Sequence, residues 1–387
     1  MDELVGTADN DTFRGFLEGT DDTLTTFDTI EGGAGTDTLN LLMEGAGPYD
    51  IPAGVEISGV EIINLVSDGT AALENDGATG LDATVFEGAE QVWLANAINA
   101  AGAVLAGEGQ TIGFRNVDAT ATVTVASDVD SASIALDRVA DKSAVSVDET
   151  TTGDLETVSV SGSLAAGADE LTIEDVTKTA ETLNLNLTTK AVDLTLTTFD
   201  SLVTLDASAS TGGIKVDLSG NADLEAASFG SGVDDVTIGG QKGLVVNAGA
   251  GADTISFDGS GEGQQIVGGA GGDTFVLTAA ATNISETDDF ADLVTTIDFK
   301  SPDVIDLSGT GFVALNDAQA DAVAAAGTFA DAFAIATGFQ AETAFLFEGS
   351  TYIVNDADNS SSFTDGDGVI ELVGFTGNLV DGTNLIA

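Results

Sequence analysis

The chain contains no histidine and no cysteine. Without histidine, neither a Ser-His-Asp triad nor a zinc site of the H-E-x-x-H type can form. Without cysteine, Cys-His chemistry, disulfides and thiolate metal sites are excluded as well. Paired carboxylates can hydrolyse glycosides, but sugar platforms usually use aromatic rings, and the chain has one tryptophan and two tyrosines. We therefore expect no enzyme activity.

Basic residues are almost as scarce, with 9 lysines and arginines against 65 aspartates and glutamates, a formal charge of −56. No basic patch is available to neutralise phosphate, which excludes nucleic acid and anionic membranes as direct partners. Carboxylates at this density repel one another within the Debye length of ~8 Å. We expect something cationic to compensate, either bound divalent ions or the salty medium to which a marine or halophilic acidic surface is adapted.

Long apolar runs are missing too. No stretch of ~18 apolar residues occurs, so no transmembrane helix and no membrane insertion are expected. The first residues, Met1-Asp2-Glu3-Leu4-Val5, have neither the basic nor the apolar region of a cleavable signal peptide. Apolar residues nevertheless make up 43% of the 387 residues. That is enough for the core of one large domain or of two to three ordinary ones.

A nine-residue phrase stands out against this background, at residues 32–40 (GGAGTDTLN) and again at 268–276 (GGAGGDTFV). Both copies match G-G-x-G-x-D-x-U-x, where U is a large apolar residue, the repeat of calcium-binding parallel β-rolls. Glycines let the backbone turn its carbonyls inward, the aspartate adds a hard anionic oxygen, and the apolar residue enters the core. Gly-Asp turns are also common turn chemistry, but two full matches favour a metal site.

Less perfect copies surround these two. Residues 248–253 lack only the first glycine, and looser copies contain Asp11, Asp22 and Asp28; Asp365 and Asp367 are weaker candidates near the end. Calcium is preferred over magnesium or zinc because the ligands are all oxygen and the geometry is loose. The predicted calcium site residues are Asp11, Asp22, Asp28, Gly33, Gly35, Asp37, Gly249, Gly251, Asp253, Gly269, Gly271 and Asp273.

Strand periodicity predicts the fold. From residue 181, strands start about every ten residues, which corresponds to half a coil of a parallel β-helix. Asp253 and Asp273 are twenty residues apart, so we expect them to stack one coil above the other, with Gln264 at the intermediate position. Residues 55–180 fit either an irregular β-helix or a β-sandwich. After 290, two helices capped by Asn316 and Thr328, a hairpin at Glu348-Gly349 and a final strand indicate an α+β cap.

The expected fold class is therefore all-β, a parallel β-helix or β-roll solenoid with a small α+β cap at the carboxyl end. We expect four segments: 1–50 with amino-terminal repeats, 51–180 as a β-rich region, 181–290 as parallel β-helix with a calcium roll, and 291–387 as the cap. Phenylalanines are expected to stack inside the coils, and Trp93 to lie in the core or at an interface.

The Gly/Asp repeats, together with residues 298–309, 352–354 and 369–374, resemble secreted RTX proteins, most of all Caulobacter-type surface-layer proteins. Residues 28–40 followed by 54–61 are similar to a recurring phrase of that group. The resemblance implies export by a type I route through an uncleaved signal in the carboxy-terminal segment. It also implies folding on calcium outside the cell and self-assembly into a lattice.

We therefore expect an extracellular or cell-surface calcium-binding structural protein, whose partner is itself in a surface layer or filament. The alternative is a calcium-dependent monomeric adhesin or ligand-binding module of the extracellular matrix, for which a cell-surface polysaccharide is a candidate partner.

Overall fold

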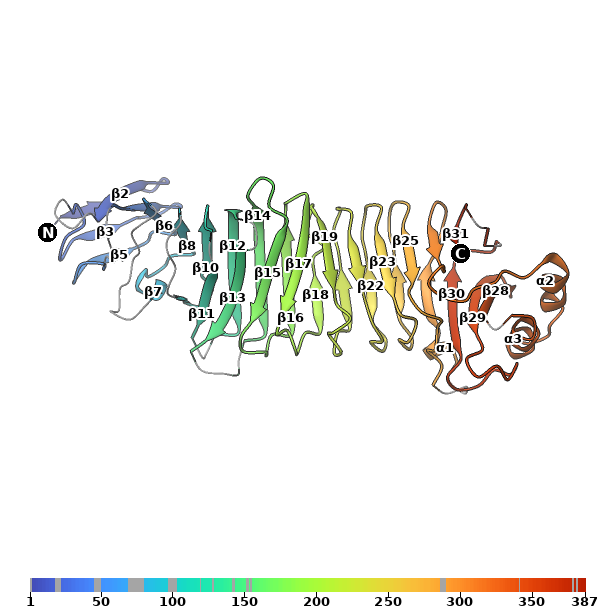
Figure 1. Ribbon diagram of the computed structural model, residues 1–387. Helices are drawn as coiled ribbons and strands as arrows, with labels where there is room; N and C mark the ends of the chain where they lie inside the picture. Colours follow the sequence, from blue (N-terminus) through green and yellow to red (C-terminus); the bar gives the residue numbers. More distant parts are fainter. Residues whose placement is uncertain are drawn as a thin grey trace. The chain divides into compact units, whose positions relative to one another are not determined.

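A computed structural model describes residues 2–17, 22–44, 50–68, 80–96, 103–118, 120–126, 129–140, 143–150, 153, 155–285, 290–340, 342–377, 379–380 and 382–387. The chain divides into two compact units, Met1–Ser201 and Leu202–Ala387. Each is built on parallel β-strands, so the protein is an all-β parallel solenoid, as predicted (Figure 1).

Unit 1 forms three parallel sheets in the orders β1-β3-β5, β2-β4-β6-β8-β10-β12-β14-β16 and β17-β15-β13-β11-β9-β7. Successive strands alternate between sheets, which is the connectivity of a solenoid. The strands are β1 (Glu3–Val5), β2 (Thr12–Leu17), β3 (Thr29–Glu31), β4 (Thr38–Met43), β5 (Glu56–Ser58), β6 (Ile62–Ser67), β7 (Gly80–Asp82), β8 (Gln91–Ala95), β9 (Ala103–Ala106), β10 (Thr111–Arg115), β11 (Ala121–Val125), β12 (Ser131–Val139), β13 (Ser143–Glu149), β14 (Thr157–Leu164), β15 (Glu170–Asp175), β16 (Thr182–Leu187) and β17 (Ala191–Thr197), with a short 3₁₀ helix at Ala83–Val85.

Strict alternation of apolar and polar residues builds the coils. In β4 the burial alternates residue by residue, with Leu39, Leu41 and Met43 turned inward. The parallel register places apolar side chains of neighbouring coils next to one another. Leu39 lies beside Ile63 on β6, and Ile63 lies beside Val92 on β8, and all three are fully buried. Burying one such side chain contributes ~1.5–3 kcal/mol. The region in which a β-sandwich was an alternative is thus built from parallel coils, because the same inward column continues through it.

Unit 2 continues the same plan, with sheet orders β18-β20-β22-β24-β26-β30-β29-β28 and β31-β27-β25-β23-β21-β19. Its coils are shorter than most in unit 1, and Phe257 and Phe275 lie fully buried inside them. The expectation that phenylalanines stack inside the coils holds for these two but not for Phe27 and Phe339, which are exposed. The strands are β18 (Thr204–Asp206), β19 (Gly213–Asp217), β20 (Ala226–Ser228), β21 (Asp235–Thr237), β22 (Val245–Asn247), β23 (Thr254–Phe257), β24 (Gln265–Val267), β25 (Thr274–Leu277), β26 (Thr295–Asp298), β27 (Val304–Asp306), β28 (Glu342–Phe347), β29 (Ser350–Asn355), β30 (Gly368–Val373) and β31 (Leu385–Ile386).

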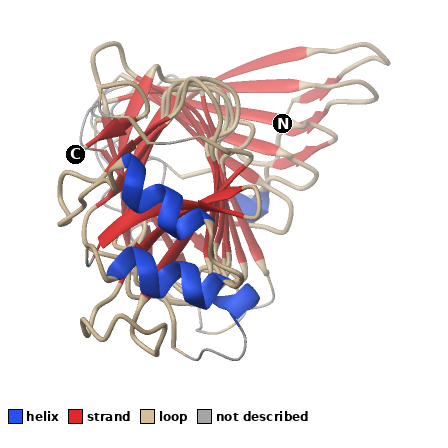
Figure 2. Cartoon of the chain, turned by 90° about the vertical axis from the view of Figure 1, so that its right-hand side faces the viewer, coloured by secondary structure: helices blue, strands red, loops and turns tan. Residues whose placement is uncertain are grey.

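The α+β cap ends unit 2. The hairpin β28–β29 is antiparallel and joins the last parallel strands through β30. Helices α2 (Asp317–Ala324) and α3 (Phe329–Thr337) pack on β28, and α1 (Phe290–Leu293) is a single turn (Figure 2). Asn316 forms a capping box with Gln319, as predicted, while Thr328 accepts the backbone N–H of Asp331 without the reciprocal bond.

Candidate metal centre: a ladder of buried aspartates

Four aspartates on one turn of unit 2 stack coil upon coil. The backbone N–H of Asp234 donates to Oδ1 of Asp253 (2.8 Å), that of Asp253 to Oδ1 of Asp273 (3.1 Å), and that of Asp273 to Oδ1 of Asp303 (3.1 Å). Each of the four side chains is about 1% exposed. The prediction that Asp253 and Asp273 lie one coil above the other is confirmed. We call Asp234, Asp253, Asp273 and Asp303 the aspartate ladder.

Three steps of the aspartate ladder leave an oxygen unpaired. Oδ2 of Asp234, Asp253 and Asp273 is buried and accepts no hydrogen bond. Oδ2 of Asp303 instead accepts the backbone N–H of Lys300 (2.9 Å). A buried oxygen without a donor costs about 1–3 kcal/mol, and more when it is charged. Three such oxygens in one column are therefore open to a partner from outside the protein, such as a proton, a water molecule or a metal ion.

The turn glycines make room for these carboxylates. A Cβ added at Gly268 would overlap Oδ2 of Asp273, which explains the first glycine of the repeat. At Gly269 and Gly271 the backbone has φ of 97° and 148°, and a Cβ would overlap the carbonyl oxygens of Gly249 and Gly251 in the preceding coil. Glycine tolerates both the dihedral and the close approach. The predicted glycines thus pack adjacent coils against each other and shape the turn around the carboxylates.

Burial perturbs the titration of the aspartate ladder. Desolvation raises the pKa of Asp253 to about 7, and the neighbouring carboxyls of Asp234 and Asp273 add to the rise. Desolvation likewise raises the pKa of Asp234 to about 6 and that of Asp273 above its ordinary range. The charged form is penalised because no donor faces Oδ2.

A shorter ladder of the same design lies in unit 1. The backbone N–H of Asp11 donates to Oδ1 of Asp37 (2.7 Å), and that of Asp37 donates to Oε2 of Glu61 (2.7 Å). Asp37 is fully buried, and its Oδ2 is again without a partner. Gly33 and Gly35 have φ of 111° and 121° in this turn. Asp11 is closer to the surface, and its Oδ2 accepts the N–H and hydroxyl of Thr7.

Asp28 and Asp22 lie outside both ladders. Asp28 is nine residues before Asp37 but sits on the other turn of the coil, where its oxygens accept the N–H of Asp2 (2.6 Å) and the N–H and hydroxyl of Thr25. These bonds, the one from Asp2 first, lower the pKa of Asp28 to about 2. Asp22 is exposed on the segment between β2 and β3. Of the predicted aspartates, the structure thus brings together Asp11 with Asp37, and Asp253 with Asp273.

Sequence reasoning missed three ladder members. Asp234 is the aspartate of the phrase Gly230-Ser231-Gly232-Val233-Asp234-Asp235-Val236. This phrase fits G-x-G-x-D-x-U, so the residue could have been recognised from the sequence. Asp303 and Glu61 have no glycine repeat before them. They lie in segments 298–309 and 54–61, which carry the resemblance, and each stands two positions before a buried isoleucine, Ile305 and Ile63.

The opposite turn of unit 2 is held by amides. Buried Gln264 donates from Nε2 to the carbonyl oxygens of Gly239 (2.7 Å) and Gln241 (3.0 Å). Gln241 in turn donates to the carbonyl of Leu218 and accepts the N–H of Gly239. Gln264 is therefore the counterpart of the ladder half a coil away, as its position between Asp253 and Asp273 predicted. The amide N–H groups of this turn are bonded to backbone carbonyls, but Oε1 of Gln264 is itself buried without a hydrogen-bond partner, so both turns keep unpaired oxygens.

A second acidic group lies in the cap loop. Oxygens of Asp356, Asp358 and Asp367 lie within 4.8 Å of one another. Asp356 and Asp367 are buried, but both oxygens of each accept backbone N–H groups, for example Ser361 to Asp356 (2.7 Å) and Thr364 to Asp367 (2.6 Å). The loop is therefore satisfied by the protein itself. Asp367, a weaker candidate from the sequence, belongs to this group.

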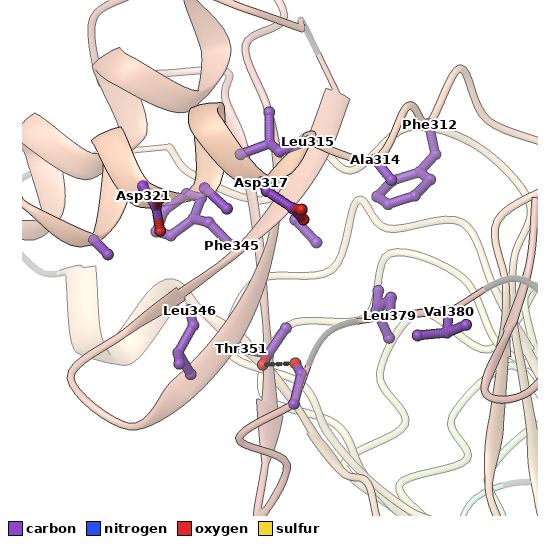
Figure 3. A pocket seen from close by; sticks show the side chains of 14 residues that line it. Phe312, Ala314, Leu315, Asp317, Asp321, Phe345, Leu346, Thr351, Leu379 and Val380 are labelled. Carbon is purple, nitrogen blue, oxygen red and sulfur yellow. Dashed lines mark hydrogen bonds between the residues drawn. The ribbon is translucent and has the colours of Figure 1, made fainter.

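The cap also contains a hollow of about 540 Å³ between α2, β28 and the carboxy-terminal segment (Figure 3). Phe312, Leu315, Phe345, Leu346 and Leu379 give it an apolar lining, and Asp317 and Asp321 stand on its helical side. Thr351 donates to the carbonyl of Gly377 (2.9 Å) at its edge.

No protein-family model matches the chain, and no curated protein is similar to it at a significant level. No helix among the described residues is long and apolar enough to cross a membrane.

Proposed function

We propose that the protein is a calcium-binding structural solenoid, in which calcium completes the aspartate ladder. The observation that supports this most strongly is the column of buried, unpaired Oδ2 atoms on Asp234, Asp253 and Asp273. All three atoms are carboxylate oxygens, the ligand that hard divalent cations prefer. Asp37 in unit 1 offers the same unpaired oxygen.

A proton and a calcium ion compete for this position. A group with a pKa of about 7, such as Asp253, is about half protonated at neutral pH. A divalent ion shared by stacked carboxylates neutralises more than one of them, which a single proton cannot do. Extracellular calcium modules bind at ~10⁻⁴–10⁻³ M, so calcium outside a cell is sufficient to load sites of this type.

The structural role rests on the fold and the charge. A solenoid whose coils contact only their neighbours is an extended scaffold. A net charge of −56 opposes contact between copies unless cations screen it. We propose that calcium acts on both levels: it closes the turns of one chain and reduces repulsion between chains. Assembly into a surface layer or filament, and export by a type I route, are proposed from the resemblance to RTX surface-layer proteins.

Negative-stain microscopy and small-angle scattering of the full chain, with calcium and with chelator, test this proposal together. We expect sheets or filaments with calcium, and dispersed, looser particles after chelation. Identical scattering profiles and circular dichroism spectra with and without calcium would contradict the calcium role. Monomeric particles that nevertheless tighten with calcium would favour the alternative, a calcium-dependent adhesin or ligand-binding module.

A further inference from the structure

Strand β28 lies at the edge of its sheet. It is the last strand in the order β30-β29-β28, so β29 occupies one of its edges and no strand of the described chain occupies the other. The segment before α2 meets this outer edge at one point, where the N–H of Val313 donates to the carbonyl of Glu342 (3.1 Å) and the hydroxyl of Thr343 donates to the carbonyl of Val313 (2.8 Å). The outer edge of β28 therefore already accepts a bond from an extended chain.

Beyond this point the outer edge presents backbone groups without partners. In an antiparallel strand every second residue turns its N–H and C=O to the same edge, so Ala344 and Leu346 point outward as Glu342 does. Thr351, which lies opposite Leu346, agrees with this, because its N–H turns away from β28 to the carbonyl of Phe375 (3.2 Å). Within the described part of the chain, no backbone group bonds to Ala344 or Leu346 on the outer side. An edge of this kind is a template for another strand.

The hollow of about 540 Å³ in the cap borders this edge. The segment that meets β28 at Val313 continues through Ala314 and Leu315 into α2, and these two residues and α2 line the hollow. Leu346 on β28 is 42% exposed, and Val380 on the opposite wall is 52% exposed (Figure 3). Large apolar side chains left exposed around a hollow mark an interaction site.

Acidic side chains stand on one wall of the hollow. Among its described lining residues only Asp317 and Asp321 are charged, and they lie one turn apart on α2. The helix N-terminus favours a carboxylate at Asp317 in the first turn, but it does not account for Asp321. Neither carboxylate has a hydrogen-bond or ion-pair partner among the described residues, whereas that of Asp331 on α3 accepts the hydroxyl of Thr328 (2.8 Å). The wall therefore attracts a basic group from outside the chain.

We propose that an extended segment of a basic partner protein adds to the outer edge of β28, with apolar side chains in the hollow and lysine or arginine side chains beside Asp317 and Asp321. An extended segment is favoured over a small molecule because only another backbone matches the spacing of the unpaired edge groups. Lysine and arginine suit the hollow, since their long stems pack on apolar surface while the charged ends reach the carboxylates.

Charge selects the partner. The chain has 9 basic residues against 65 acidic ones, so a second copy offers few basic segments, and an acidic partner is repelled. In strand addition the backbone bonds supply affinity and the side-chain pockets supply specificity. The edge of β28 and the hollow beside it provide both, independently of the aspartate ladder.

Fluorescence anisotropy of a labelled peptide on the full chain in calcium tests the proposal. The probe is the peptide VVKKVVKK with blocked ends, which when extended shows an apolar and a basic side chain two positions apart on either face. We expect saturable binding at physiological salt, and none of the acidic counterpart VVEEVVEE. The double change Asp317→Asn with Asp321→Asn should weaken binding about tenfold, because two ion pairs are lost. Leu346→Gln should weaken it about fivefold, because apolar contact is lost.

Backbone pairing is tested on the peptide, where no variant of the protein has to fold. N-methylation of every second residue removes the N–H groups along one edge of the extended peptide and keeps its side chains. Of the two peptides methylated in this way, one should bind about tenfold more weakly, because its lost N–H groups face Ala344 and Leu346. The other should bind as the unmodified peptide does. Equal affinities of the two would overturn the proposed strand addition.

The matched control is Asp217→Asn with Asp258→Asn, which removes the same two charges from unit 2 outside the cap. Each of these carboxylates accepts the N–H of a serine two positions later, and asparagine keeps that acceptor. The control should bind the peptide as the unchanged chain does. An equal loss of binding in the control would show that the peptide follows overall charge alone and would overturn the proposal.

Two other results would also overturn it. The first is the absence of saturable binding, or equal binding of the acidic peptide. The second is a fall in particle mass on Leu346→Gln without any peptide, which would assign the hollow to a contact between copies. None of these substitutions touches the aspartate ladder, so the effect of calcium on the melting temperature should remain in every variant.

Discussion

Replacing Asp253 with asparagine separates calcium binding from folding. In the calcium-free protein, Asp253→Asn keeps an oxygen for the N–H of Asp234 and removes a buried carboxyl whose charged form is penalised. We therefore expect the calcium-free variant to be as stable as the unchanged chain at pH 7.5, or more so. With calcium present it should lose stability, because an anionic ligand is missing.

The size of the effect follows from binding linkage. At ten times the dissociation constant, one site adds about 1.4 kcal/mol. For a unit of this size 1 kcal/mol shifts the melting temperature by roughly 2–4 °C, so one site corresponds to about 3–6 °C. Calorimetry in 10 mM calcium and in chelator measures the shift, and Asp253→Asn should reduce it by at least this amount.

Asp258→Asn is the matched control. Asp258 directly follows the same strand, β23, but it accepts the N–H and hydroxyl of Ser260 outside the ladder. The control should retain the full calcium shift. If Asp253→Asn also retains it, or if the variant is strongly destabilised in chelator, the ladder is not the calcium site that we propose.

Three further outcomes are expected. The folded protein holds protons on Asp234 and Asp253 up to a pH of about 6 and 7, whereas carboxyls in the unfolded chain lose theirs near ~3.9. The calcium-free protein should therefore lose stability as the pH rises through 6 to 7. Urea midpoints at pH 5 and pH 8 measure this, and a higher midpoint at pH 8 would contradict it. Gly269→Ala should destabilise the folded protein by more than ~1–3 kcal/mol, because the strain of a positive φ combines with overlap between the new Cβ and the carbonyl oxygen of Gly249. Gly243→Ala should destabilise it less, because Gly243 also has a positive φ but no atom lies near its added Cβ. Equal melting temperatures for the two variants would refute this. Phe333→Ala in the cap core should cost ~3–5 kcal/mol in unfolding experiments, and an unchanged midpoint would show that the cap is not packed as described.

Periodicity made the fold predictable. Strict alternation in segments such as 182–187 indicates strands with one buried face, and the ten-residue strand spacing indicates two strands per coil. Parallel stacking follows because each coil must bury the edge of the preceding one. The caps at Asn316 and Thr328 were readable because capping depends on a local hydrogen bond. For residues 55–180 the long connections and variable coil lengths hid the period, so two architectures fitted.

The site was only partly predictable, because a repeat gives spacing but not the side of the coil. Asp28 and Asp37 are one nine-residue repeat apart, yet that distance is half a coil, so they lie on opposite turns. Asp303 enters the ladder from a coil 30 residues later, a separation that no short pattern indicates. Trp93 lies on the outward side of β8, and its orientation depends on Gly113 in the next strand, which is adjacent only after the coils have stacked.

The most direct test of the account is a crystal structure of the full chain grown in calcium, with anomalous data collected at a long wavelength. We predict calcium peaks about 2.3–2.6 Å from the Oδ2 atoms of Asp253 and Asp273. Peaks confined to surface carboxylates, or Oδ2 atoms that face protein donors with no peak beside them, would contradict the account.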